Sequence, residues 1–178
     1  ELLMLVAIAW GTLLAGGAEA LGLSKELGIP VSEARGFIQG YFERFPGIKG
    51  CVETTLQKAR SQGYVETLFG RRLMLRDIRA SKPVLRQAAE RAAINAPMQG
   101  TAADIIKRAM ISVDGWLAGH RDRALMILQV HDELVFEADE AFVPELLEQV
   151  PALMAGAAEL RVPLVVDSGV GENWDQAH

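Results

Sequence analysis

The feature that most constrains the fold is the segment from Met126 to Glu137, in which two apolar runs are joined through His131-Asp132-Glu133. Short apolar runs around a polar break predict a β-hairpin, although hairpin turns usually carry Asn-Gly or Asp-Gly. Adjacent carboxylates repel each other and supply none of glycine's backbone freedom. The turn therefore indicates either a solvated acidic loop or a partner that needs negative charge, most simply a hard divalent cation.

Length and composition limit the class of protein. The chain has 178 residues, half of them hydrophobic, which is enough to bury one core. The single cysteine, Cys51, excludes an internal disulfide and is typical of a reducing compartment. A net charge of −5 argues against a generally basic nucleic-acid binder, so any contact with DNA must be local. Basic residues do cluster in one stretch, at Arg71, Arg72, Arg76, Arg79, Lys82, Arg86 and Arg91.

The first twenty residues are unusual, because the run from Leu2 to Ala18 carries no charge. Ala18-Glu19-Ala20 is similar to a signal-peptide cleavage site, but the run opens with Glu1 where an export signal would be basic. It is also slightly short for a membrane span and is interrupted by glycines. The pattern favours a buried apolar helix.

Periodicity and capping signals along the rest of the chain predict helices alternating with short strands. Pro83 suits the first turn of a long helix, and Ser32 is a candidate N-cap. The expected helices run over 32–45, 48–63, 83–117 and 142–155, with a small hairpin over 64–75 and a further strand over 162–167.

The long predicted helix carries polar residues at every fourth position: Gln87, Arg91, Asn95 and Gln99. Residues with this spacing share one helix face. Their side chains can donate to purine N3 and pyrimidine O2, minor-groove acceptors that occupy similar positions in every correct base pair. Such a face would hold a duplex end regardless of sequence and would sense a mispair. The spacing alone also fits an ordinary solvated face, which is the commoner case.

Three strings give the chain a family resemblance: Gln87 to Met110, Gln129 to Glu137, and the ending from Gly171 to His178. Together they resemble the C-terminal part of the polymerase domain in the bacterial DNA polymerase I family, a branch of the family A DNA polymerases. The resemblance implies an α+β fold that is truncated at its N-terminus. Residues 1–82 would form a partial, helical fingers-like region with a small hairpin, of which residues 1–20 are atypical. Residues 83–178 would form a palm-like antiparallel sheet backed by helices.

The resemblance also implies a function, that of a fragment of a DNA-directed DNA polymerase from the bacterial cytoplasm, active in replication and repair. Such an enzyme transfers a nucleotidyl group from a dNTP to a primer 3′-hydroxyl. The implied partners are primer–template DNA and, in the complete enzyme, a dNTP; no membrane is involved.

The same resemblance assigns residues to roles. Asp132 would be a catalytic metal ligand and Glu133 a weaker contributor, at a site for two Mg²⁺ ions. The DNA-binding residues implied by the family are Arg91, Asn95 and Gln99 on the long helix, with Gln129 and His131 at the primer terminus.

The chain departs from the family pattern at its start. Ile8, Thr12 and Gly16 stand where the family has a lysine, an aromatic residue and a tyrosine in its nucleotide-binding helix, so nucleotide-binding residues stay unassigned. The family's other catalytic aspartate, in an Asp-Tyr-Ser-type motif, would lie before Glu1. The metal site is therefore incomplete, and we expect the isolated chain to be inactive.

Two alternatives stay open at this point. The first is a non-catalytic module that binds duplex ends through Arg91, Asn95 and Gln99. The second is a metal-dependent phosphodiesterase that uses Asp132 and Glu133 with a further carboxylate. The sequence leaves the oligomeric state open, although an uncovered sheet edge would favour pairing between chains.

Overall fold

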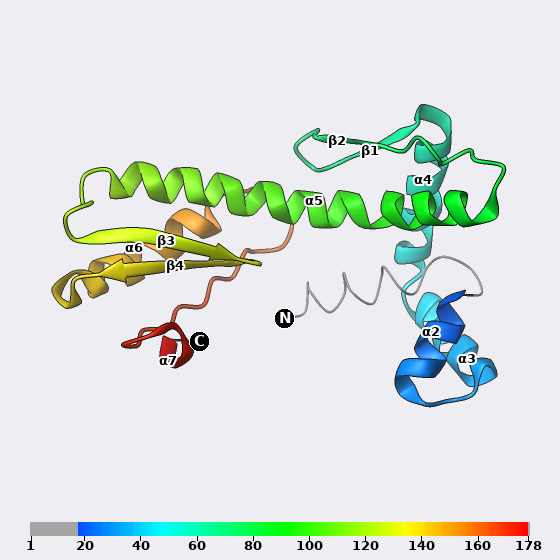
Figure 1. The fold of residues 1–178 in the computed structure, drawn as a ribbon, viewed down its shortest axis with the longest axis horizontal. Coiled ribbons are helices and arrows are strands. Elements are labelled where there is room, and N and C mark those ends of the chain that lie inside the picture. The colour runs from blue at the N-terminus through cyan, green and yellow to red at the C-terminus, as the bar shows by residue number, and fades with distance from the viewer. Residues whose placement is uncertain (1–17, 178) are drawn as a thin grey trace. The chain divides into compact units, whose positions relative to one another are not determined.

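The computed structural model describes residues 18–177, which form an α+β chain with two small antiparallel sheets (Figure 1). The fold class expected from the sequence is confirmed. The chain divides into two compact units, Glu1–Thr101 and Ala102–His178, within the longest helix, α5 (Pro83–Leu117). The domain boundary predicted after residue 82 stays a prediction. The apolar helix expected near the start, with Ile8, Thr12 and Gly16, lies outside the described residues.

The first unit begins with three helices, α2 (Ala18–Leu27), α3 (Val31–Arg44) and α4 (Pro46–Gln62). The predicted Ser32 cap is wrong, because the N-cap residue of α3 (Val31–Arg44) lies two positions earlier, at Pro30. Its carbonyl accepts the N–H groups of Glu33 and Ala34 at 3.0 and 3.1 Å, so no serine hydroxyl is needed to start the helix. Helix α4 ends as predicted at Gly63, whose φ of 81° is a conformation that glycine adopts without strain.

A small hairpin follows, formed by β1 (Tyr64–Glu66) and β2 (Arg72–Met74) in antiparallel register, and it confirms the hairpin expected there. Figure 1 shows it beside α5. Val65 turns into a core that also takes Leu75 and Ile78, while α5 contributes the small residues Ala89 and Ala93. Alanines on the helix let the hairpin approach it closely, so this core is built around the N-terminal part of α5.

Helix α5 runs unbroken over the predicted range despite weak helix formers in its middle. Proline costs about 3 kcal/mol and glycine about 1 kcal/mol relative to alanine in a helix interior, and the helix contains Pro97 and Gly100. Pro97 also leaves one carbonyl of the preceding turn without its usual N–H donor. Contacts from outside the helix must therefore support this stretch.

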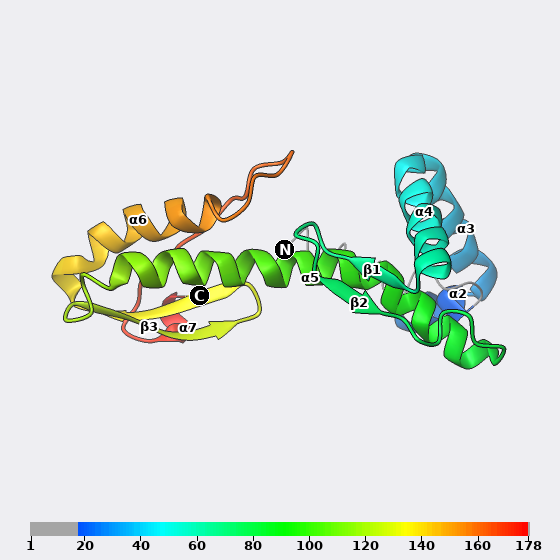
Figure 2. The same ribbon diagram turned by 90° about the horizontal axis from the view of Figure 1, so that it is seen from above.

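The second unit builds its core from the C-terminal part of α5, a hairpin of β3 (Ala124–Val130) and β4 (Glu133–Ala138), the 3-10 turn η1 (Glu140–Phe142), and α6 (Val143–Ala155). Figure 2 separates α6 from the hairpin, with the C-terminal part of α5 drawn between them. The buried residues are Val113, Leu117, Ala124, Phe142, Leu146 and Val150. This arrangement confirms an antiparallel sheet backed by helices.

Strand β3 contains a β-bulge. Met126 pairs with Phe136 and Leu128 pairs with Val135, which leaves Ile127 as the extra residue. Paired residues share a face of the sheet, and successive residues of β4 alternate faces. Leu128 therefore lies on the face opposite Met126, with 47% of its surface exposed, while Met126 packs against the core.

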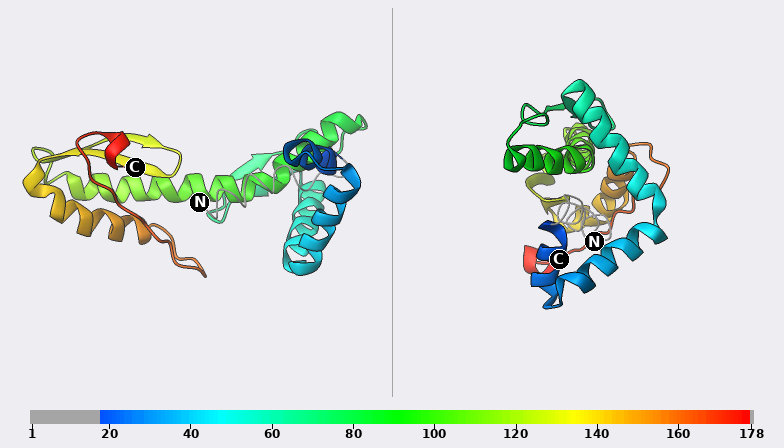
Figure 3. Two further views of the ribbon diagram at one scale, coloured as in Figure 1. Left: turned by 90° about the horizontal axis from the view of Figure 1, so that it is seen from below. Right: turned by 90° about the vertical axis from the view of Figure 1, so that its right-hand side faces the viewer.

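The strand predicted over 162–167 is wrong. Residues 160–173 contain no helix or strand, and the chain reaches only a short helix, α7 (Trp174–Ala177), beyond them. Figure 3 shows this orange-to-red segment as an extended trace. An apolar run becomes a strand only where a neighbouring backbone pairs with it, and Val162 and Val165 are exposed at 62% and 80%.

The position of Phe142 gives a stability prediction. Its ring is fully buried, stacks on Trp116 with centroids 5.7 Å apart, and lies under the Arg123 guanidinium. We expect Phe142→Ala to lower the free energy of unfolding by about 3–5 kcal/mol, because it leaves a cavity between α5 and α6. Leu147→Ala on the exposed side of α6 is the control and should cost about 1 kcal/mol or less. Similar costs for both, measured by urea denaturation, would contradict this core.

Candidate functional site

The acidic turn is a two-residue loop. Val130 pairs with Glu133, so His131 and Asp132 alone connect β3 to β4, and Glu133 belongs to the strand rather than the turn. His131 has a φ of 53°, and no other non-glycine residue in 18–177 has a positive φ. Histidine tolerates this region better than most residues, but its Cβ still makes the conformation unfavourable. The strain lies directly beside the carboxylate that the sequence singled out.

Gln129 braces this turn. Its Nε2 donates a hydrogen bond of 2.6 Å to the backbone carbonyl of His131. That carbonyl belongs to the peptide that links His131 to Asp132. The hydrogen bond therefore orients the peptide plane that precedes the Asp132 Cα atom. The sequence indicated Gln129 only as a DNA contact. In the structure its amide forms a hydrogen bond within the protein.

The turn offers hard oxygen ligands. The Asp132 side chain is exposed, and Glu133 beside it is half-buried. Carboxylates of this kind suit Mg²⁺, which binds through one or two carboxylates while keeping water or substrate oxygens. Within the described residues, no group of three or more His, Cys, Asp or Glu is placed to hold a metal ion. The two carboxylates are oxygen donors of the kind that hard divalent cations take.

The polar face expected on α5 is present, because the helix continues through the whole stretch. Arg91 and Gln99 are exposed, and Asn95 is half-buried. The three residues span about two turns of one continuous helix. Ala93, on another side of the helix, is fully buried. The three donors thus lie along one strip of the first unit. Gln129, His131, Asp132 and Glu133 gather at the β3–β4 turn of the second unit.

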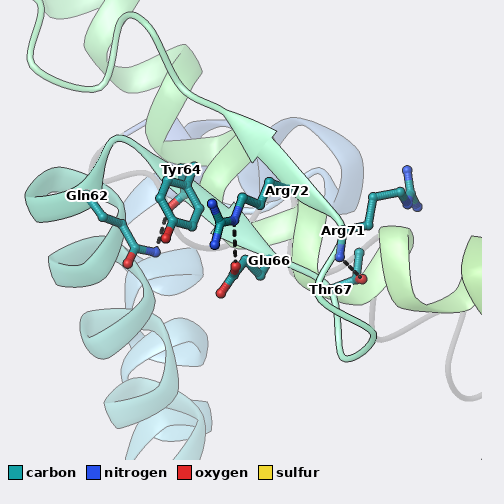
Figure 4. Close-up of polar contacts among 6 residues, drawn as sticks. All are labelled: Gln62, Tyr64, Glu66, Thr67, Arg71 and Arg72. Carbon is teal, nitrogen blue, oxygen red and sulfur yellow. Dashed lines mark hydrogen bonds and ion pairs between the residues drawn. The ribbon is translucent and has the colours of Figure 1, made fainter.

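Several arginines of the basic cluster bind protein atoms. Arg79 donates to the carbonyls of Arg60 and Ser61, both at 2.6 Å, and closes the end of α4. Arg72 pairs with Glu66 at 2.8 Å and lies over the Tyr64 ring, which keeps it within the β1–β2 hairpin (Figure 4). The hydrogen bond with Glu66 raises the pKa of Arg72 above its usual range. Arginines of this cluster therefore stabilise the protein itself, whether or not they also contact DNA.

Arg71 has a different target from Arg72, although the two are neighbours in sequence. Its Nη2 donates to the Gly100 carbonyl of α5 at 2.9 Å. Figure 4 shows the two side chains leaving the hairpin in different directions. Gly100 and Thr101 lie in the segment from Gln87 to Met110 that resembles the polymerase family, but the sequence assigned no role to either residue. The available signal was the grouping of Pro97, Gly100 and Thr101 inside one helix.

The chain is similar to proteins of a known family. Residues 7–176 match the model of DNA polymerase family A. DNA polymerase I of Pseudomonas aeruginosa is 55% identical over 162 residues, covering 91% of this chain and 18% of the relative. The thermostable DNA polymerase I of Thermus aquaticus is 46% identical over 158 residues, covering 89% and 19%. The chain thus spans less than a fifth of the length of these relatives.

A solved structure is also similar. It is the POL domain of Pol1 from M. smegmatis, in complex with DNA primer-template and dNTP. The TM-score is 0.88 at 42% sequence identity, and the match covers 98% of this chain and 30% of that one. Separately, among residues 18–177 no helix is long and apolar enough to cross a membrane.

The strain at His131 can be tested by substitution. We expect His131→Gly to match or exceed the original chain's free energy of unfolding, by up to about 1 kcal/mol, because glycine adopts a φ of 53° without a Cβ penalty. His131→Ala removes the same ring but keeps the Cβ, so it should be less stable than the glycine variant. Chemical denaturation of both measures the difference, and an alanine variant at least as stable would disprove a strained turn.

Proposed function

Since the chain belongs to DNA polymerase family A, we propose that it forms part of a DNA-directed DNA polymerase of the bacterial cytoplasm, acting in replication and repair. Its partners would be primer–template DNA and, in the complete polypeptide, a dNTP. The reaction would be nucleotidyl transfer to a primer 3′-hydroxyl. The M. smegmatis neighbour, solved with both ligand classes, supports this proposal.

The observation that carries the proposal is the donor strip on α5. Arg91, Asn95 and Gln99 present guanidinium and amide donors at one-turn intervals on a continuous helix. Minor-groove acceptors are common to all correct base pairs, so such a strip suits an enzyme that holds any sequence but must detect a mispaired primer end. Gln129 and His131 would add contacts at the primer terminus.

The acidic turn would supply metal ligands. Asp132 would bind a divalent ion directly, with Glu133 as an indirect contributor, and Mg²⁺ matches these oxygen donors. Bound metal ions would activate the primer hydroxyl and stabilise charge on the phosphates. Two ions need more ligands than these carboxylates provide, so we propose that another part of the polypeptide completes the site.

A second function is favoured by the location of the strip. All three donors lie in the first unit, whereas Asp132 and Glu133 lie in the second. DNA binding through the strip therefore needs no carboxylate. The chain alone would act as a non-catalytic module that binds the end of a duplex.

The binding proposal predicts a specific loss on substitution. We expect Arg91→Ala to weaken binding of a primed duplex by about tenfold, since it removes a charged hydrogen-bond donor from the strip. Arg44→Ala removes the same charge from an exposed site on a different helix, α3, and should change affinity little. Fluorescence anisotropy with a labelled primer–template provides the dissociation constants. Equal losses in both variants would refute the assignment of the strip.

The incomplete metal site predicts the outcome of primer extension. With Mg²⁺, all four dNTPs and a primed template, we expect no extension by this chain or by its Asp132→Asn variant. Gel analysis of the labelled primer gives the result. Extension that disappears in Asp132→Asn would show that the chain holds a complete catalytic site, contrary to the proposal.

A further inference from the structure

The loop of the β1–β2 hairpin binds α5 at its intrinsically weakest stretch. Pro97, Gly100 and Thr101 fall within five consecutive positions of the helix, and each is a poor helix former. Leu68 N–H donates to the Thr101 hydroxyl at 2.9 Å, and Arg71 donates to the Gly100 carbonyl at 2.9 Å. The loop thus contacts the helix where propensity alone would not maintain it.

The Thr101 hydroxyl links the loop to the helix. It accepts from Leu68 N–H and donates to the carbonyl of Pro97, four residues earlier. A threonine hydroxyl that bonds back to this position tends to bend a helix. Here the same oxygen is also held by the loop, so the geometry of the turn between Pro97 and Thr101 depends on where the loop sits.

Gly100 makes the close approach possible. A Cβ at this position would lie 2.7 Å from Thr67 Cγ2, closer than real contacts allow, and 3.4 Å from Arg71 Nη2. Thr67 cannot easily rotate away, because its hydroxyl accepts the N–H of Arg71 at 3.2 Å (Figure 4). The loop therefore fits against α5 only when residue 100 is glycine.

Gln99 lies inside the supported turn, next to Gly100. We propose that the hairpin loop, through Arg71 and Thr101, is a positioning element that sets the direction of Gln99 on α5 and so sharpens discrimination against a mispaired primer end. This inference rests on the proposed function. Arg71 and Thr101 need not touch DNA themselves, because they would act through Gln99.

The first test uses the Thr101 hydroxyl alone. Thr101→Val keeps the shape and removes both hydrogen bonds, whereas Thr101→Ser keeps the hydroxyl. We expect the Leu68 amide, measured by NMR hydrogen exchange in the 178-residue chain, to lose protection in the valine variant and keep it in the serine variant. Unchanged protection in Thr101→Val would overturn the proposed link.

The second test measures its consequence for DNA. We expect Thr101→Val and Arg71→Ala each to weaken binding of a matched primer–template about fivefold, and to weaken a mismatched one less, so that the ratio of dissociation constants falls. Arg72→Ala is the matched control, because it removes the same charge from a side chain held within the hairpin. It should leave that ratio unchanged. A general loss of folding would weaken matched and mismatched binding equally, which would also overturn the proposal.

The third test asks whether the effect passes through Gln99. In a Gln99→Ala background, Thr101→Val should cause no further loss of affinity, since the side chain that it positions is absent. Additive losses would overturn the inference. If Arg91→Ala and Gln99→Ala weaken binding while Thr101→Val behaves as Thr101→Ser, the inference fails and the proposed function stands. If the unsubstituted chain does not bind primed duplex, the inference fails together with the proposed duplex-binding function of the chain alone.

Discussion

Burial of α5 is the constraint on which the rest of the described structure depends. Its N-terminal part supplies Ala89 and Ala93 to one hydrophobic core, and its C-terminal part supplies Val113 and Leu117 to the other. Neither hairpin has enough apolar surface to fold alone, since two-stranded hairpins are marginal in water. Each gains stability by packing on this helix. The exposed strip therefore lies on a helix whose other side is packed into a hydrophobic core.

Regular periodicity allowed much of this fold to be predicted. The range Pro83–Leu117 was readable from Pro83 as a helix start and from a pattern long enough to outweigh Pro97. The two hairpins were equally readable from apolar runs around short breaks. The strand predicted over 162–167 was wrong because residues with high β-propensity form a strand only when a neighbouring strand packs and pairs with them. The described residues place no strand beside this segment. Ser32 misled because Pro30 already supplies the start of the helix.

The sequence indicated which residues make up the candidate site, but not which contacts hold those residues in place. The acidic turn singled out Asp132, and the helical period placed Arg91, Asn95 and Gln99 on one face, but only the family resemblance assigned roles to these residues. The contacts of Arg71 with Gly100 and of Gln129 with the His131 carbonyl depend on tertiary geometry or on an unusual φ. Neither can be derived from local propensity. The same holds for the arginine cluster, where adjacent Arg71 and Arg72 turned out to serve different partners.

The bulge at Ile127 has a mechanical consequence. A bulge increases the twist of its strand, so the tip of the β3–β4 hairpin is rotated relative to its base. The base packs against the core through Met126 and Phe136. Ile127 is an aliphatic residue with no reactive group. As the extra residue of the bulge, it influences the direction in which the Asp132 side chain points from the hairpin tip. The direction of an exposed carboxylate thus depends on the number of residues in a strand.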